Sequence, residues 1–394
     1  MGSNFNIGSF NAINTDEKEK PKKSSSGGSK DELRKKLLFL GAIILGGVLV
    51  LFLILFIVSS VMGRNYTYDD MEEIMTNAAM AYFEDNPDKL PSENQRVEID
   101  VATLAASGYM DEMVEYTGED STCTGKVTVQ TNGEDYLYIP NLQCGDDYTT
   151  QSLQEVVTDK VVTEGYGLYE VGDSYVYRGE NVNNYLELDN ALWRIVKIND
   201  NGQIMLILDT EISTSYPWDD RYNAGVGYNS GINTYSASRI RDTLSEFYGT
   251  NDEDDAILSN SDRSKLDTFD LCTGKRSEGD TTKDNSVECS ETLADQNIGL
   301  LTASDYMMAS LDANCNTITD YSCQNYNYLV SGYRWWLVTA SSDSTNDTYA
   351  ISNVGVASST STSSYMRIRP IVMLDASVLY DSGRGTANKP YKVK

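Results

Sequence analysis

Residues 333–339 read Y-R-W-W-L-V-T, and this stretch places two of the chain's four tryptophans, Trp335 and Trp336, side by side. Its β-branched and aromatic residues predict a strand, and adjacent side chains of a strand point to opposite faces of its sheet. One indole should therefore point to each face of the sheet.

An apolar run covers residues 37–62, which carry no charge and consist mainly of Leu, Ile, Val, Phe and Gly. At about 1.5 Å per residue, a helix of this length exceeds the roughly 30 Å hydrocarbon core of a bilayer. A signal peptide would have a shorter apolar region, about 7–15 residues, with a small-residue cleavage site. The sequence therefore predicts a single transmembrane helix over residues 37–62.

Basic residues precede this run. Residues 1–36 hold eight Lys and Arg against five Asp and Glu and include the low-complexity stretch K-K-S-S-S-G-G-S-K. An excess of Lys and Arg marks the cytoplasmic side of a membrane helix. We expect residues 1–36 to be a disordered cytoplasmic tail, the protein to lie in the plasma membrane as a single-pass protein, and its C-terminal part to be extracellular.

The part after the run is strongly acidic. Residues 65–394 contain 54 Asp and Glu against 22 Lys and Arg, a net charge of −32. Such a surface repels nucleic acid and anionic lipid headgroups. The composition therefore excludes nucleic acid as a partner.

All cysteines lie in this acidic part, as expected for an exported region with disulfides. Proximity in sequence favours pairing neighbours, although fifteen pairings are possible on paper. No C-x-x-C occurs and the chain has no histidine, so common zinc patterns are missing and we predict no metal site. The predicted disulfides are Cys123–Cys144, Cys272–Cys289 and Cys315–Cys323.

The missing histidine also removes the imidazole base of Ser-His-Asp and Cys-His nucleophile systems. The sequence contains no G-x-S-x-G, P-loop or dinucleotide fingerprint. Paired carboxylates are abundant, but in so acidic a domain their closeness in sequence indicates nothing. We predict no catalytic residues and no cofactor.

A small α+β module is expected over residues 65–150. Thr67 and Asp70 fit a capping box before an amphipathic helix that ends at Asn86-Pro87. The runs K-V-T-V-Q and D-Y-L-Y-I then flank Asn132-Gly133, a strong hairpin signal. Cys123 and Cys144 lie at nearly equal distances from this turn, so their disulfide would close the open end of the hairpin.

A larger domain is expected over residues 165–394, after a connection at 151–164. Two β-rich runs flank Asn201-Gly202, a second hairpin signal. The segment T-Y-S-A-S-R-I-R-D-T-L-S-E-F-Y reads as a helix, with Ile240, Leu244 and Phe247 on one face.

The order of five segments, W-R-I-V, Y-S-A-S-R-I-R, L-L-T-A-S-D-Y, W-W-L-V-T and R-I-R-P-I-V-M-L, resembles that in an uncharacterised family of bacterial surface proteins. That family is similar to C-type lectin-like and formylglycine-generating-enzyme-like domains. The small module resembles the juxtamembrane helix-plus-hairpin unit of such proteins. The predicted fold class is therefore α+β: one transmembrane helix, a small α+β module and a C-type lectin-like ectodomain, meaning an antiparallel sheet with long loops. In such a fold, one indole of the 335–336 pair would fill the core against a helix and the other would pack beneath the long loops, with Trp193 in the same core. A carbohydrate-stacking role for one indole is the alternative.

The resemblance implies a fold that presents variable loops for recognition, and not catalysis or Ca²⁺-dependent sugar binding. Formylglycine-generating enzymes bind copper through reactive cysteines, and sugar-binding C-type lectins use E-P-N or Q-P-D with W-N-D to bind Ca²⁺; neither pattern occurs here. A recognition loop is the remaining expectation. The candidate is Y-P-W-D-D-R-Y at 216–222, in which aromatic rings and carboxylates could contact a ligand: Tyr216, Trp218, Asp219, Asp220 and Tyr222. The alternative is a loop folded back onto the core.

Two functions remain open. The preferred one is a membrane-anchored extracellular binding or adhesion protein without catalytic activity, whose partner is an unknown glycan, protein or cell-wall polymer. The alternative is a structural, pilin-like subunit of a cell-envelope assembly.

Overall fold

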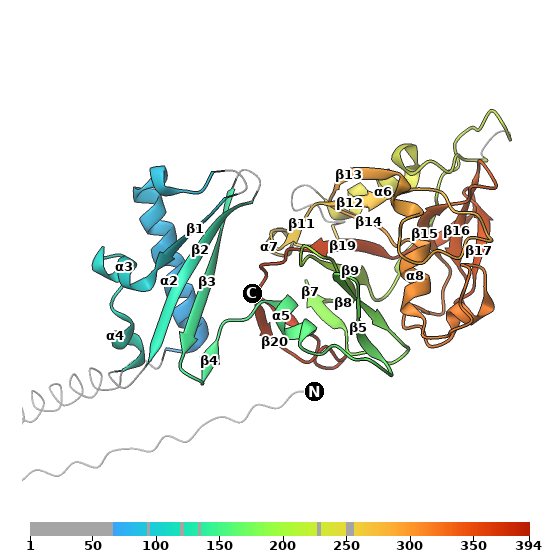
Figure 1. The fold of residues 1–394 in the computed structure, drawn as a ribbon. Helices are drawn as coiled ribbons and strands as arrows, with labels where there is room; N and C mark the ends of the chain where they lie inside the picture. Colours follow the sequence, from blue (N-terminus) through green and yellow to red (C-terminus); the bar gives the residue numbers. More distant parts are fainter. Residues whose placement is uncertain (1–65, 93–94, 119–121, 133–134, 227–229, 250–255) are drawn as a thin grey trace, which may run out of the picture. The chain divides into compact units, whose positions relative to one another are not determined.

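The computed structural model describes residues 66–394 except five short segments, 93–94, 119–121, 133–134, 227–229 and 250–255 (Figure 1). The chain from Thr67 to Lys394 forms one unit by its contacts. The predicted tail, 1–36, and the predicted membrane span, 37–62, lie outside the described residues.

The helix α2 (Tyr68–Asp85) opens the described chain as the sequence predicts. The Thr67 hydroxyl accepts from the amide of Asp70 at 3.1 Å, and the Asp70 carboxylate accepts from the amide of Thr67 at 2.7 Å. This reciprocal capping box satisfies two amides that a helix start leaves free. The helix buries Met71, Met75 and Phe83 and ends at Asn86, before the short 3₁₀ turn η1 (Pro87–Lys89).

A four-stranded sheet in the order β1-β2-β3-β4 packs against α2 in this small module. Cys123 and Cys144 stand opposite each other in the β2–β3 register and form a disulfide, which confirms the predicted closure of the hairpin. Two short helices complete the module. The bounds are β1 (Arg96–Asp100), α3 (Val101–Ala106), α4 (Met113–Thr117), β2 (Cys123–Asn132), β3 (Asp135–Cys144) and β4 (Tyr148–Thr149).

The larger part, from the helix α5 (Leu153–Thr158) onward, contains an eight-stranded sheet whose main path is β11-β19-β9-β8-β6-β5. β14 pairs with β19, and β7 pairs with β8. The strands β8 and β9 form the hairpin predicted at Asn201-Gly202, where Gly202 adopts φ +87°. The bounds are β5 (Gly167–Val171), β6 (Ser174–Arg178), β7 (Tyr185–Leu188), β8 (Ala191–Ile198), β9 (Ile204–Leu208), β11 (Leu266–Asp267), β14 (Gly299–Leu300) and β19 (Pro370–Leu374).

A second, five-stranded sheet has the order β10-β18-β15-β16-β17. All of its neighbours are antiparallel except β15 and β18. The bounds are β10 (Ile212–Pro217), β15 (Trp335–Ala340), β16 (Asp347–Ile351), β17 (Ala357–Ser361) and β18 (Tyr365–Ile368).

Two-stranded sheets and short helices fill the connections. The predicted helix is confirmed as α6, which buries Ile240 and Leu244. The bounds are α6 (Arg239–Tyr248), α7 (Asn260–Arg263), β12 (Phe269–Cys272), β13 (Thr292–Gln296), α8 (Ala303–Ala309), β20 (Tyr380–Ser382), β21 (Lys392–Val393), η2 (Tyr235–Ala237), η3 (Glu288–Ser290) and η4 (Tyr321–Gln324).

The adjacent indoles of β15 are both fully buried, as predicted, and belong to one core together with Trp193. Trp335 meets Tyr306 of α8 edge-on at 6.0 Å between ring centroids. Trp336 donates its indole N–H to the backbone carbonyl of Tyr216 at 2.9 Å. One ring thus contacts a helix, and the other is fixed to the first residue of the predicted recognition loop.

The disulfides Cys272–Cys289 and Cys315–Cys323 also form as predicted. The predicted fold class, however, is wrong. The described residues are mostly sheet, and among them no helix is long and apolar enough to cross a membrane. The longest helix of this part, α2, carries carboxylates at both ends, with only ten uncharged residues, 74–83, between them, and the other described helices have ten residues or fewer.

Candidate functional site

The predicted recognition loop is folded onto the interior at its tryptophan. Trp218 has no exposed surface and donates its indole N–H to the carbonyl of Leu337 in β15 at 3.1 Å. Its ring meets Tyr235 edge-on, with 6.0 Å between centroids. The residue therefore packs in the core, which is the alternative that the sequence left open.

The acidic residues of this loop lie beside arginines. Asp219, also without exposed surface, accepts from the Arg221 guanidinium at 2.8 and 3.0 Å. Asp220 forms an ion pair with Arg239 at 2.7 Å. Their charges are thus balanced within the loop and the helix that follows it.

The tyrosines of the loop differ in exposure. Tyr216 is half-buried and meets Phe247 edge-on at 5.7 Å, whereas Tyr222 exposes 55% of its surface. The structure therefore does not bring the five predicted site residues together on one accessible surface. In the described ranges no group of three or more His, Cys, Asp or Glu is placed to hold a metal ion.

A different part of the larger domain contains a polar pocket of about 460 Å³. It lies where the β8–β9 hairpin, β12 and the start of α8 meet. Methionine, leucine and phenylalanine side chains form its apolar lining, while amides and carboxylates supply hydrogen-bonding groups. We call it the polar pocket; its residues used below are Lys197, Asn199, Asn201, Gln203, Met205, Phe269, Asp270, Asn285, Asp295, Thr302, Asp305 and Met373.

An ion pair stands at the inner end of the polar pocket. The Lys197 ammonium contacts the Asp305 carboxylate at 2.9 Å, and the side chain of Asp305 is 2% exposed against 18% for Lys197. Asn285 donates its amide to the same carboxylate at 2.8 Å, and the Thr302 hydroxyl lies 2.7 Å from its second oxygen. Thr302 also caps α8 by accepting from the amide of Asp305 at 3.0 Å. Both carboxylate oxygens are therefore fixed in direction.

Asp305 stays ionised in this setting. Burial raises the pKa of the carboxyl, but the Lys197 charge and the hydrogen bonds from Lys197, Thr302 and Asn285 outweigh it and leave the pKa below its ordinary value. The pair thus presents a fixed dipole toward the polar pocket without a net charge.

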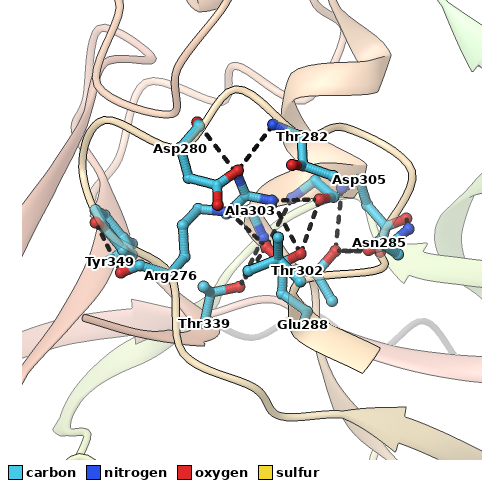
Figure 2. A network of polar contacts seen from close by, with 12 residues as sticks. Arg276, Asp280, Thr282, Asn285, Glu288, Thr302, Ala303, Asp305, Thr339 and Tyr349 are labelled. Atoms are coloured by element: carbon cyan, nitrogen blue, oxygen red, sulfur yellow. Dashed lines mark hydrogen bonds and ion pairs between the residues drawn. The ribbon is translucent and has the colours of Figure 1, made fainter. Parts of the chain in front are cut away.

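The segment that carries Asn285 is closed by the Cys272–Cys289 disulfide, whose two cysteines also line the polar pocket. A buried ion pair holds this segment in place (Figure 2): Arg276 donates to Glu288 through two nitrogens, at 2.9 and 3.0 Å. The guanidinium and the carboxylate have no exposed surface. A bidentate pair of this kind fixes the relative orientation of its two groups.

The surrounding groups complete the hydrogen bonding of this pair. Ser304 accepts from Arg276 at 2.7 Å and donates to Glu288 at 2.8 Å, and Thr339 donates to Glu288 at 3.3 Å. Asp280 contacts the third guanidinium nitrogen at 3.1 Å, as Figure 2 shows. We call Arg276, Asp280, Glu288, Ser304 and Thr339 the brace. It ties the disulfide-closed segment to α8 and β15, so the wall of the polar pocket is held by covalent and polar contacts.

The remaining lining of the polar pocket is open to solvent on its polar side. Asp270 and Asp295 are exposed, and neither has a side-chain hydrogen bond or ion pair within the described part of the chain. Asn201 and Gln203 stand on the hairpin and share a hydrogen bond of 2.9 Å. With the Lys197–Asp305 pair neutral, the two free carboxylates make the polar pocket negative. It therefore disfavours anionic ligands and offers acceptors to hydroxyl or amino groups.

The polar pocket was not predicted from the sequence, although two segments that contribute to it were used to predict the fold. The segment W-R-I-V continues to Lys197, and L-L-T-A-S-D-Y contains Thr302 and Asp305. Lys197, at the end of a buried strand, could have indicated the site, because a buried charge requires a partner of opposite charge. No protein-family profile, curated protein or solved structure matches this chain.

Proposed function

We propose that the chain is an exported binding protein without catalytic activity and that the polar pocket recognises a neutral, hydroxyl-rich ligand, the glycan of a cell surface or cell wall. The observation that carries the proposal is the pocket's composition: amides and carboxylates beside an apolar wall that includes Phe269 and Met205. Sugars present hydroxyl groups together with apolar C–H faces, and sites that bind small ligands combine a few oriented polar groups with apolar lining.

Preorganisation supports recognition. The Lys197–Asp305 pair, Asn285 and Thr302 are fixed by mutual hydrogen bonds before any ligand arrives. A binding site whose groups are already ordered loses less conformational entropy on binding. The disulfide Cys272–Cys289 contributes to the same rigidity.

An extracellular location fits the three disulfides, because such bonds persist in oxidising compartments. It also fits the strongly acidic composition, which favours solubility. Glycans of the cell surface are accessible in that location.

Titration calorimetry of the full chain against neutral oligosaccharides tests the proposal. Asp270→Ala should weaken binding by about tenfold, the usual value of a hydrogen bond to a charged group. Asp173→Ala is the matched control, since Asp173 is another exposed aspartate and lies outside the polar pocket. No binding across neutral, acidic and amino oligosaccharides, or equal loss in both variants, would contradict the proposal.

A further inference from the structure

Edge strands of a sheet expose unpaired backbone N–H and C=O groups, and proteins usually protect them with charges, proline, bulges or short length. Most edges in the described ranges follow this rule. Charged residues stand on β1, β5, β7, β12, β13 and β20, whereas β4, β11, β14 and β21 are two residues long. β10 has an irregular register and ends at Pro217.

The strand β17, with the sequence A-S-S-T-S, is the exception among these edges. It ends the five-stranded sheet, at the far end of its order from β10. Figure 1 shows it next to β16. Its five residues pair with β16 in continuous register, without a bulge. Outside the β16 ladder, two hydrogen bonds involve the backbone of β17 in the part of the chain that is described. The Ser364 amide donates to the Ser361 carbonyl at 2.9 Å, and the Thr360 hydroxyl donates to the Ser358 carbonyl of the same strand at 3.2 Å.

The uncharged region extends beyond the strand. From Thr348 to Met366 no residue carries a charge, in a chain whose formal net charge is −28. Two copies of so acidic a protein repel each other wherever their carboxylates meet. β17 itself therefore brings no carboxylate to a contact between two copies; the nearest one on its sheet neighbour is Asp347, opposite Ser361 at the end of the strand.

We propose that β17 pairs antiparallel with β17 of a second copy of this chain and extends the five-stranded sheet across a two-fold axis. The strand is self-complementary for this pairing. Centred on Ser359, it sets Ser358 opposite Thr360 of the second copy, and hydroxyl pairs of this kind form cross-strand hydrogen bonds. The backbone groups left open on β17 become paired at the same time.

A five-residue ladder is small beside a standard interface of about 1,600 Å², so the dimer is weak and depends on concentration. The dimer has two ligand sites, whereas the monomer has one. Two weak sites on one particle bind a repetitive polymer more tightly than one site alone. Dimerisation itself does not depend on what the polar pocket binds.

Sedimentation velocity of the full chain between roughly 1 μM and 1 mM tests the pairing, a range that spans weak association. The wild type should shift from monomer to dimer as concentration rises. Ser359→Lys sets two ammonium groups opposite each other and should weaken association by about tenfold or more. Ser213→Lys, an exposed serine of the opposite edge strand β10, should leave it unchanged.

Near-ultraviolet circular dichroism establishes that each variant is folded. Ser358 is exposed, so Ser358→Lys serves as a second disrupting variant should Ser359→Lys fail to fold. A wild type that remains monomeric over the whole range, or lysine variants in β17 that associate as the wild type does, would overturn the proposal.

Discussion

Consecutive residues of α8, Ser304 and Asp305, belong to two different polar clusters. Ser304 points into the brace, in which Arg276 and Glu288 are completely buried and hydrogen-bonded on every side. Asp305 belongs to the polar pocket, where its ion-pair partner Lys197 is partly exposed. The same pocket is also lined by the exposed carboxylates of Asp270 and Asp295. The same residue types therefore fix structure where all partners are internal and can receive a ligand where partners are left open.

The largest expected effect is a loss of stability on mutating the brace. Glu288→Ala leaves the Arg276 guanidinium buried without its carboxylate, and removing one member of a buried pair costs about 3–5 kcal/mol of the free energy of unfolding. Urea denaturation followed by tryptophan fluorescence measures it. A loss below about 1 kcal/mol, the range of a surface pair, would show that the brace does not stabilise the fold.

The disulfide that closes the braced segment should have the next largest effect. Cys272→Ser with Cys289→Ser opens a loop with a sequence separation of 17 residues, and loop-closure entropy predicts a loss of about 3 kcal/mol. Because these cysteines line the polar pocket, ligand affinity should fall as well in calorimetry. Unchanged affinity in the folded double variant would mean that the disulfide-closed segment is not part of the binding site.

Acid should act on the polar pocket through Asp305. Its folded pKa is lowered below the ordinary value of 3.8, so its contribution to stability is present above pH 3.8 and is lost as the pH falls through the folded pKa. Asp305→Asn should cost about 1–3 kcal/mol at pH 7. Denaturation at several pH values should show that the difference in free energy of unfolding between wild type and variant becomes smaller below pH 3.8. A difference that grows on acidification would contradict a lowered pKa of Asp305.

The smallest expected effect concerns the open edge of the polar pocket. Asp270 is exposed and has no side-chain partner in the described residues, so Asp270→Ala should change the free energy of unfolding by less than about 0.5 kcal/mol. Thermal unfolding checks this, with Asp173→Ala as its control. A large destabilisation would place Asp270 among the structural residues and remove the contrast with the brace.

Local signals in the sequence predicted local structure well. The capping box at Thr67, the Asn201-Gly202 hairpin and the three disulfides, with separations of 21, 17 and 8 residues, depend on residues close in the chain. The alternation of a strand predicted that the indoles at 335 and 336 point to opposite faces, and their burial was expected from the fold that the resemblance implied. The fold class could not be obtained in the same way, because it depends on how distant strands are arranged in sheets.

The partner of Lys197 in the polar pocket could not be predicted, because the central pair joins Lys197 to Asp305, 108 residues apart. The tryptophan of the predicted recognition loop lies in the core for a related reason. Y-P-W-D-D-R-Y has the composition of an exposed loop, but Trp218 is held inside by a carbonyl of β15, 119 residues away. No pattern within either segment reveals such a distant partner.

Hydrogen–deuterium exchange of the full chain with and without a neutral oligosaccharide mixture tests the central claim most directly. The account predicts slower exchange in peptides that cover 197–205, 268–272 and 285–305, with 216–222 unchanged. Protection confined to 216–222, or no protection anywhere at saturating ligand, would contradict it.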